Sequence, residues 1–391
     1  MSDRPSSFKA IKLGDVVTFQ RGFDITKSEQ TEGRIPIVSS SGISSFHNQW
    51  KTKGPGVVIG RKGTLGTVHF LNEDFWPHDT TLWVKDFKGN YCRFLYYFLQ
   101  TLHLENFDTG SSNPTLNRNH IHKIWVVFPT LDVQLKIAAI LSAYDDLIEN
   151  NRRRIALLEK MAEEIYREWF VRLRFPGHEQ TKFEKGVPVG WQQSTLGNVA
   201  TFTMGQSPSS EHFNERGDGL PFHQGVGTYG KRFPKTVTYC SVDGRRARKG
   251  DILFSVRAPV GRLNIANVDM IIGRGLAAIR HGREKNAYLY YLLKSAFAAE
   301  DIIGNGSIFN SVGKDELAKF PIYQPVPDLV DRFESIAVKM DKEIAVLIES
   351  VDKLAATRDA LLPRLISGKL AVDDLDIRFP PGMAEASAQA I

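Results

Sequence analysis

Basic side chains are concentrated in one stretch of the chain, residues 242–285. This stretch holds ten lysines and arginines against four acidic residues, and its excess of six equals the net charge of the whole chain, +6. A local basic excess on an otherwise neutral chain favours a polyanionic partner, with DNA or RNA as the leading class. A basic surface that contacts only water is the alternative.

The candidate nucleic-acid contacts of the second half of the chain lie on segments rich in turn residues. Lys and Arg side chains position a protein on phosphates, whereas a few bidentate Arg, Asn or Gln side chains read base edges. The predicted contacts are His223, Gln224, Tyr229, Lys231, Arg232, Arg245, Arg246, Arg248, Lys249, Arg257, Arg262 and Arg274. His223, Gln224 and Tyr229 are the candidate base readers.

The first half of the chain offers a matching set of side chains on similar turns. They are Arg21, Arg34, Lys51, Arg61, Lys62, His78 and Arg118. Aligning Lys62 with Arg257, and Gly66 with Gly261, puts one cation at the same turn in both halves. Any single member is more readily a phosphate contact or a solvated side chain than a base reader, because phosphate contacts predominate.

Motifs for catalysis and cofactor binding are present only in incomplete form. Residues 225–230 satisfy G-x-G-x-x-G, but a dinucleotide loop must open a helix, and the following residues 231–234 (KRFP) predict a turn. Asn113 and Pro114 lack the second proline and the aromatic residue of an amino-methyltransferase motif. His120 and His122 lack further ligands at metal spacing. The sequence therefore predicts no catalytic residue, metal or cofactor in this chain.

Composition bounds the class of protein. With 391 residues, 42% hydrophobic and 24% charged, the chain is expected to fold into two domains or more. Cys92 and Cys240 cannot form a disulfide framework or a cysteine-based zinc site. No stretch of about 18 apolar residues occurs. A cytoplasmic protein is therefore expected rather than a secreted or membrane-spanning one.

The chain contains an internal repeat, which is the strongest signal in the sequence. Residues 13–19 (LGDVVTF) match residues 196–202 (LGNVATF), and Gly22 falls on Gly205. Residues 94–97 match residues 288–291 at an offset of 194. Gly110 and Ser111 match Gly306 and Ser307, and Lys123 and Pro129 match Lys319 and Pro325, all at an offset of 196. Four blocks in one order predict two copies of one fold, with loop insertions explaining the drift in offset.

Each copy has the same predicted order of elements. Short strands come first, at residues 16–20, 56–60, 67–71 and 81–84 in the first copy and 251–255 and 262–266 in the second. A short helix follows, at 93–102 or 287–298. A loop rich in Gly and Ser and a strand ending at Pro129 or Pro325 lead into one long helix.

The two long helices carry residues that alternate at spacings of four and three, the seam of a left-handed coiled coil. Ala162 and Ala337 complete this spacing between the larger seam residues that follow. The seam of the first helix is Ile137, Leu141, Tyr144, Ile148, Asn151, Ile155, Leu158, Ile165 and Trp169. The seam of the second is Phe333, Met340, Ile344, Leu347, Val351, Leu354, Arg358, Leu361 and Leu365. The polar members Asn151 and Arg358 are interpreted as setting register, or as facing a partner subunit.

A stripe of this length needs a helical partner, because one small domain cannot bury about 50 Å of helix. We expect the two helices to pair with each other in antiparallel orientation; pairing with a second chain is the alternative. The predicted fold is α+β, with two similar mixed α/β domains separated by two long antiparallel coiled-coil helices and an internal pseudo-two-fold repeat. The predicted segments are a first domain 1–130, a helix 131–175, a second domain 176–327, a helix 328–372 and a disordered tail 373–391.

These features resemble the specificity subunit of type I restriction–modification systems. The resemblance rests on residues 187–191 (VPVGW) followed by Leu196 and Gly197, on residues 361–370 (LLPRLISGKL), and on the order domain, helix, domain, helix. The first copy departs from the pattern, because it begins at Lys12 without Pro-x-Gly-Trp. We interpret this as a trimmed N-terminus rather than a different fold.

The resemblance implies a non-catalytic, DNA-binding subunit. In that family the globular parts are target-recognition domains that each read one half of a bipartite, asymmetric site. The helices fix the spacing and dock two modification (methyltransferase) subunits, to which restriction subunits are added. S-adenosylmethionine is then expected in the methyltransferase partner, and ATP and Mg in the restriction subunit. A self-contained DNA methyltransferase or nuclease, and a coiled-coil scaffold with no role at DNA, are the alternatives.

Overall fold

The computed structural model describes residues 5–107, 115–302, 311–380 and 383. The chain forms two compact units, of which unit 1 comprises Met1–Asn151 with Glu349–Ile391 and unit 2 comprises Arg152–Ile348. Both long helices, α4 (Leu131–Tyr166) and α8 (Pro327–Ile366), contribute one part to each unit. Unit 1 is therefore built from two stretches of sequence, whereas unit 2 is a single stretch.

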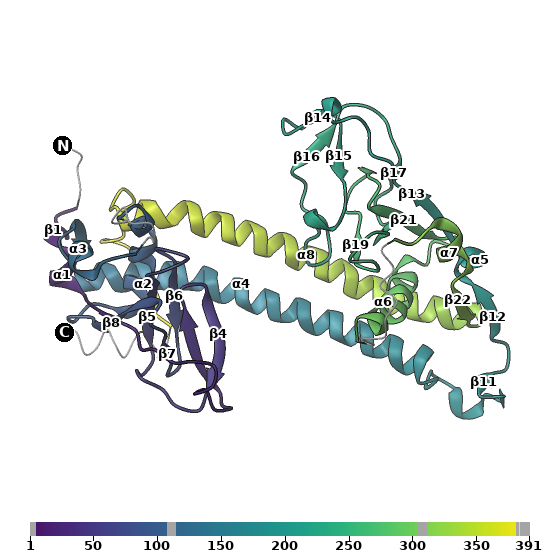
Figure 1. Cartoon of the computed structure of the whole chain (residues 1–391), viewed down its shortest axis with the longest axis horizontal. Helices are drawn as coiled ribbons and strands as arrows, with labels where there is room; N and C mark the ends of the chain where they lie inside the picture. Colours follow the sequence, from purple (N-terminus) through teal and green to yellow (C-terminus); the bar gives the residue numbers. More distant parts are fainter. Residues whose placement is uncertain (1–4, 108–114, 303–310, 381–382, 384–391) are drawn as a thin grey trace. The chain divides into compact units, whose positions relative to one another are not determined.

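The core of unit 1 is a four-stranded antiparallel sheet (Figure 1). In spatial order its strands are β2 (Thr18–Arg21), β8 (Thr81–Asp86), β5 (Gly56–Gly60) and β6 (Val68–Leu71). Strand β5 is buried along its whole length, as expected for its Val-Val-Ile run. The helix α2 (Cys92–Gln100) packs against β5 and β6. Two smaller sheets complete the unit, β4 (Gly42–His47), β3 (Ile35–Ser39) and β7 (Trp76–Pro77), and the pair β1 (Phe8–Lys12) with β9 (Trp125–Pro129).

Unit 2 repeats this topology. Its central sheet has the order β13 (Ala200–Met204), β21 (Leu276–His281), β18 (Ile252–Ser255) and β19 (Leu263–Ile265), and β12 (Gln192–Thr195) pairs with β22 (Pro321–Gln324). A five-stranded sheet contains β14 (Phe213–Asn214), β16 (Thr238–Cys240), β15 (Leu220–His223), β20 (Met270–Ile272) and β17 (Arg246–Ala247). Its parallel pair β15–β20 corresponds to the parallel pair β3–β7. The predicted duplication is confirmed.

The repeated glycines are explained by close backbone approaches. A Cβ atom at Gly14, in α1 (Leu13–Val16), would lie 2.9 Å from the Cβ atom of His122, and one at Gly197, in α5 (Leu196–Val199), would lie 3.0 Å from the carbonyl oxygen of Ala318. At Gly22 and Gly205 the nearest carbonyl oxygens would be only 2.0 and 2.1 Å away. Only glycine fits at Gly22 and Gly205, and the tight contacts at Gly14 and Gly197 favour glycine in the shared Leu-Gly pairs. The predicted strand 16–20 was wrong at its start, because Val16 closes α1.

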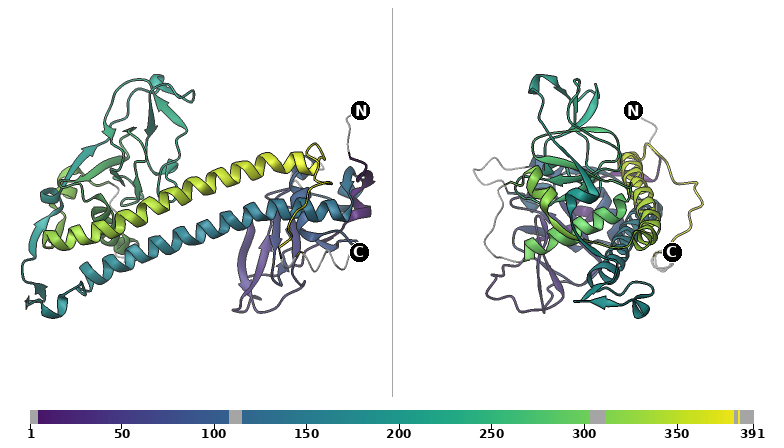
Figure 2. Two further views of the ribbon diagram at one scale, coloured as in Figure 1. Left: turned by 180° about the vertical axis from the view of Figure 1, so that it is seen from behind. Right: turned by 90° about the vertical axis from the view of Figure 1, so that its right-hand side faces the viewer.

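Helices α4 and α8 run antiparallel within each unit (Figures 1 and 2). In unit 1 the Asn151 amide lies 3.2 Å from the hydroxyl of Ser350, and Arg358 donates to Asp145 at 2.6 Å. In unit 2 Arg154 forms an ion pair with Glu343 at 2.6 Å. The partner numbers fall along α8 as they rise along α4, which defines the antiparallel sense and confirms the predicted intramolecular pairing.

The predicted seam residues lie along this helix pair, and none of the eighteen is exposed. Helix α4 ends at Tyr166 and continues as a π-helical turn, η2 (Arg167–Val171). Trp169 lies in this turn and packs edge-on against Phe333, with 6.2 Å between ring centroids. The last apolar seam residue of the first helix therefore contacts the first of the second helix.

The segment after α8 is part of unit 1. Lys136 donates to the backbone carbonyl of Asp373 at 2.6 Å, and Ile377 and Phe379 pack against the hydrophobic core of unit 1. The predicted disordered tail 373–391 is therefore wrong for residues 373–380. Residues 381–382 and 384–391 lie outside the described residues, as does the predicted Gly-Ser-Asn loop.

Candidate nucleic-acid interface

The basic run of unit 2 is organised by the short edge strand β17. Ala247 is fully buried, whereas its neighbours Arg246 and Arg248 are exposed, as the two-residue period of a strand requires. Arg245 and Lys249 are exposed as well. Arg246 is bound by Asp243 at 2.8 Å, which orients its guanidinium on the surface. Four adjacent cations thus project from one edge of the five-stranded sheet.

A second pair of cations flanks the turn between β18 and β19. Arg257 and Arg262 are exposed, and Gly261 between them has φ +84°. A Cβ atom at Gly261 would also lie 3.1 Å from Phe297, so the turn requires glycine on both counts. Lys231, Gln224 and Arg274 are likewise exposed, and the amide oxygen of Gln224 accepts from Ser207 at 2.7 Å.

The corresponding turn of unit 1 has the same construction. Lys62 is exposed and Gly66 has φ +71°. Lys62 forms a single β-bridge with Thr115, and Arg257 forms one with Ser311. Each cation forms an equivalent bridge and precedes an equivalent glycine by four residues. The alignment of Lys62 with Arg257 predicted from sequence therefore also holds in the structure.

The other predicted contacts of unit 1 form a group around Asp79. Arg21 binds Asp79 at 2.8 Å, Nδ1 of His78 lies 3.1 Å from it, and Arg61 reaches its backbone carbonyl at 3.4 Å. Burial, reinforced by the charge of Arg21, lowers the pKa of Arg61. The remaining cations are Arg34, Lys51 and Arg118. Arg34 and Arg118 are exposed, and the Lys51 ammonium lies 4.6 Å from the centroid of the Trp76 ring.

One cluster in the described part of the chain has the spacing of metal ligands. Asp24, His78 and Asp79 each offer a ligand atom, and these atoms lie within 4.8 Å of one another. The carboxylate of Asp79 is already engaged by Arg21 and His78. An ion-pair network accounts for this geometry, and the cluster serves to hold Arg21 and His78 in place on the surface.

Three predicted contacts of unit 2 are placed in the interior, and their assignment to a DNA surface is corrected. Arg232 is 1% exposed, donates to Asp341, lies 3.6 Å from Glu159, and stacks 4.7 Å from the centroid of Tyr290. It attaches the loop after η5 (Val226–Thr228) to both long helices. That loop does not open a helix, as the sequence predicted for the G-x-G-x-x-G stretch.

The candidate base readers His223 and Tyr229 are also turned inward. His223 is fully buried and hydrogen-bonds through Nδ1 to the hydroxyl of Thr228 at 2.8 Å. Burial lowers its pKa to about 4, so the ring is neutral. The hydroxyl of Tyr229 is buried, and burial raises its pKa. Neither polar group faces the surface. His223 is enclosed because β15 continues its buried pattern from Phe222 to His223.

The side chains that fix the globular parts to the helices were missed by sequence reasoning. In unit 1, Asp145 accepts from Tyr97 and Arg358 and lies 3.6 Å from Arg93. In unit 2, Asp341 accepts from Arg232. A signal was present, because Asp145 and Asp341 are separated by the seam offset of 196 and each directly follows a seam residue, Tyr144 or Met340.

The chain thus consists of two copies of one α+β fold together with a pair of long antiparallel helices. A solved structure, the type I restriction–modification S subunit from M. genitalium, has this fold, with a TM-score of 0.67 at 16% identity over 93% of this chain and 97% of that one. A sequence model described as the type I restriction modification DNA specificity domain matches residues 5–160 and 188–363. The chain belongs to this family, with one domain match in each copy.

Individual relatives share part or all of the chain. The putative type I restriction enzyme MjaX specificity subunit of Methanocaldococcus jannaschii is 32% identical over 266 residues, which cover 66% of this chain and 62% of that protein. The type I restriction enzyme MjaVIII specificity subunit of the same organism is 23% identical over 421 residues, covering 95% of both chains. No helix in the described part of this chain has the length and apolarity of a membrane span.

Proposed function

We propose that this chain is the DNA sequence-specificity subunit of a type I restriction–modification complex. Each globular part reads one half of a bipartite, asymmetric DNA site. The observation that carries this proposal is the pair of equivalent glycine turns with exposed cations, Lys62 in unit 1 and Arg257 in unit 2. Because the surrounding side chains differ between the copies, the two half-sites differ as well.

The paired helices set the spacing between the half-sites in this proposal. Helix α4 has 36 residues, about 54 Å at 1.5 Å per residue, which is enough to separate two readers by more than the roughly 34 Å of one DNA turn. The seam and the Asn151–Ser350 hydrogen bond keep the helices in one register. Because the register is fixed, the length of the paired helices determines the distance along the DNA between the two half-sites.

An exposed apolar stripe on unit 2 supports docking of a methyltransferase subunit. Leu157, Met161 and Val346 are 60%, 51% and 62% exposed. Leu157 and Met161 follow Arg154 by three and seven residues, and Val346 follows Glu343 by three, so all three lie on the flank marked by the Arg154–Glu343 ion pair. Apolar residues gathered on one flank are typical of an interaction surface.

This docking surface is tested by co-purification with tagged methyltransferase subunits. The double variant Leu157→Asp and Met161→Asp should lose co-purification while keeping its thermal unfolding temperature. Ala156→Asp, an exposed position elsewhere on α4, is the matched control and should co-purify normally. Retention of the double variant in the complex would exclude this stripe as the docking surface.

Catalysis lies in the partner subunits under this proposal. The methyltransferase subunits bind S-adenosylmethionine, and restriction subunits added through them use ATP and Mg. A self-contained methyltransferase is the competing function, and calorimetric titration of the purified chain with S-adenosylmethionine separates the two. Saturable binding by the chain alone would overturn the proposal.

The direct experiment is to express the chain with its methyltransferase subunits and map modified bases in host DNA by sequencing. The proposal expects one split motif with two different halves. Replacing unit 2 residues 200–320 by the corresponding part of a relative should change one half and leave the other unchanged. A change in both halves, or a continuous motif, would contradict one reader per unit.

A further inference from the structure

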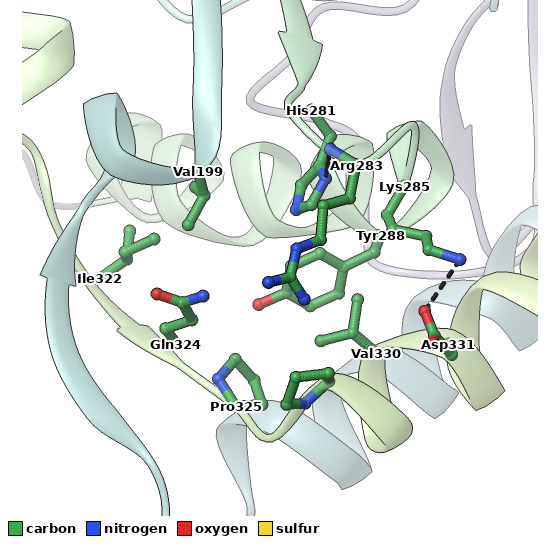
Figure 3. A pocket seen from close by; sticks show the side chains of 11 residues that line it. Val199, His281, Arg283, Lys285, Tyr288, Ile322, Gln324, Pro325, Val330 and Asp331 are labelled. Atoms are coloured by element: carbon green, nitrogen blue, oxygen red, sulfur yellow. Dashed lines mark hydrogen bonds and ion pairs between the residues drawn. The ribbon is translucent and has the colours of Figure 1, made fainter.

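A pocket of unit 2 is lined by several hydrogen-bond donors that have no acceptor in the described part of the protein. It is open to solvent and lies between the end of β21, strand β22 and the first turn of α8 (Figure 3). The polar residues of its lining are His281, Arg283, Lys285, Tyr288, Gln324 and Asp331. None of them is among the predicted DNA contacts, although Arg283 and Lys285 belong to the basic stretch 242–285.

Two of these side chains are buried with their polar atoms turned into the pocket. His281 is 8% exposed and Tyr288 is 4% exposed. Within the described residues, neither Nε2 of His281 nor the hydroxyl of Tyr288 has a hydrogen-bond partner in the protein. Figure 3 shows the Tyr288 hydroxyl, the Arg283 guanidinium and the Gln324 amide turned toward the same space. These polar groups converge on one open pocket and have no protein acceptor there, so they are available to donate to a ligand.

The protonation of these groups makes them donors. Nδ1 of His281 accepts from the backbone N–H of Arg283 at 3.0 Å. Burial, helped by Arg283 and Lys285, lowers the pKa of His281, so the neutral ring carries its proton on Nε2. Burial raises the pKa of Tyr288, which keeps the phenol protonated. Nε2–H, the phenol and the guanidinium therefore all donate into the pocket.

The charges of the residues that line the pocket indicate the charge of the ligand that it can bind. Lys285 is bound by Asp331 at 2.8 Å, so these two charges cancel. Arg283 makes no ion pair with any described residue, and the nearby carboxylate of Glu334 is held by the backbone N–H groups of Ala287 and Tyr288, so the guanidinium is available to an anion. The first turn of α8 adds the positive end of a 40-residue helix. A single negative charge on oxygen atoms that only accept hydrogen bonds matches this lining.

The first copy shows what the same place looks like without a ligand site. Phe94 and Phe128 are the equivalents of Tyr288 and Gln324 at the offsets of 194 and 196. Their rings are buried and pack edge-on with 5.4 Å between centroids. Unit 1 therefore fills with two aromatic rings the place where unit 2 keeps a phenol, an amide and an open volume. The polar lining is thus not required by the fold.

We propose that this pocket binds a carboxylate, held by the Arg283 guanidinium, Nε2–H of His281 and the Tyr288 hydroxyl. The carboxylate comes either from a small organic acid or from the C-terminus of a polypeptide, since both present the same group. Carboxylate–guanidinium pairs with neutral donors beside them are the stronger kind of hydrogen bond. None of its residues is a predicted DNA contact, so this proposal does not depend on the proposed function.

Calorimetric titration of the full chain tests this proposal, in a buffer free of carboxylate and phosphate and at constant ionic strength. The probes are acetate, N-acetylglycine as a mimic of a chain end, and N-acetylglycinamide as its uncharged control. Acetate and N-acetylglycine should bind saturably and N-acetylglycinamide should not. Tighter binding of N-acetylglycine than acetate supports a chain end, and equal binding supports a small acid.

The variants locate the binding. Gln324→Phe copies the first unit and should fill the pocket, and Arg283→Gln removes the exposed cation; each should weaken acetate at least about tenfold. Arg216→Gln, at an exposed arginine of unit 2 that is not a predicted DNA contact, is the matched control and should bind acetate normally. If Gln324→Phe does not fold, Arg283→Gln carries the test. Absent acetate binding, equal binding of the amide, tighter binding of inorganic phosphate, or unchanged affinity in Arg283→Gln would each overturn the proposal.

Discussion

Asp145 on α4 and Asp341 on α8 stand 196 residues apart at equivalent points of the two copies, and each binds an arginine that reaches it from another element. Asp145 accepts from Arg358, and Asp341 accepts from Arg232. Tyrosines accompany both pairs, since Tyr97 donates to Asp145 and Tyr290 lies under Arg232. Both copies contain the carboxylate, but the arginine that binds it differs. In unit 1 it comes from α8, and in unit 2 it comes from the loop after η5.

Removing Arg232 should destabilise unit 2. Arg232→Met leaves Asp341 without its arginine and Glu159 without a nearby cation, and an uncompensated charge of this kind costs about 3–5 kcal/mol. Burial raises the pKa of Asp341, although its side chain is 21% exposed, so its ionised form depends on the nearby arginine. Urea denaturation measures the effect. Lys231→Met, at the exposed neighbour, should change the unfolding free energy by less than about 0.5 kcal/mol.

Normal stability of Arg232→Met, together with weaker DNA binding by the assembled complex, would contradict the buried role of Arg232. It would support Arg232 as a DNA contact instead. The current geometry does not allow it, because the guanidinium is enclosed by two helices and two tyrosine rings.

His223 makes the stability of unit 2 depend on pH. Because burial lowers its pKa to about 4, the unfolded chain binds a proton between pH 6.5 and 4 that the folded chain does not. Its contribution is complete above pH 6.5 and is lost as pH falls toward 4, by at most about 3 kcal/mol. Denaturation curves for the natural chain and His223→Gln should therefore converge as the pH is lowered.

Other buried histidines also contribute to the dependence of stability on pH. The pKa values of His122 and His281 are also lowered by burial, so His223→Gln removes only part of the slope. His120→Gln, at an exposed histidine, should leave the slope unchanged. A slope in His223→Gln equal to that of the natural chain would mean that His223 is not buried as a neutral ring.

Reversing the charges at the edge of the five-stranded sheet should abolish DNA binding. Arg245→Glu, Arg246→Glu and Arg248→Glu together replace three cations by three acids at exposed positions. The salt dependence of log K should also become shallower, by about 0.9 for each phosphate that the variant no longer neutralises. Filter retention of the assembled complex at several salt concentrations measures both effects.

The matched control reverses three exposed lysines of the same unit, Lys182, Lys185 and Lys319. It carries the same change in net charge and should retain DNA binding. Equal weakening in both triple variants would indicate a general effect of charge, and unchanged binding in both would favour the scaffold alternative.

Shortening both helices by one heptad should shorten the gap in the DNA site. Deleting residues 148–154 and 344–350 removes facing segments that include Asn151 and Ser350 and keeps the seam in phase. Seven residues correspond to about 10.5 Å, or roughly three base pairs. Modified-base mapping should show the same two half-sites closer together. An unchanged gap would remove the role of the helices in spacing.

The regular parts of this fold could be predicted because their signals are local. The seams follow from spacings of three and four, and the copies follow from short identical blocks. The burial of Arg232 could not be predicted, because its partner Asp341 lies 109 residues away. A basic residue in a turn has the same sequence signature whether it meets phosphate or a buried carboxylate. Ile377 and Phe379 were missed because isolated apolar residues show no period.

The division of α4 and α8 between the units determines the order in which the protein can fold during its synthesis. Unit 2 is one uninterrupted stretch, Arg152–Ile348, and has all its core residues once that stretch leaves the ribosome. Unit 1 lacks Leu365, Ile366 and Val372 of its core until the end of α8 and the residues after it have been made. Its first stretch must therefore wait, with apolar surface uncovered, and translation arrest before residue 365 would leave it open to proteases and chaperones.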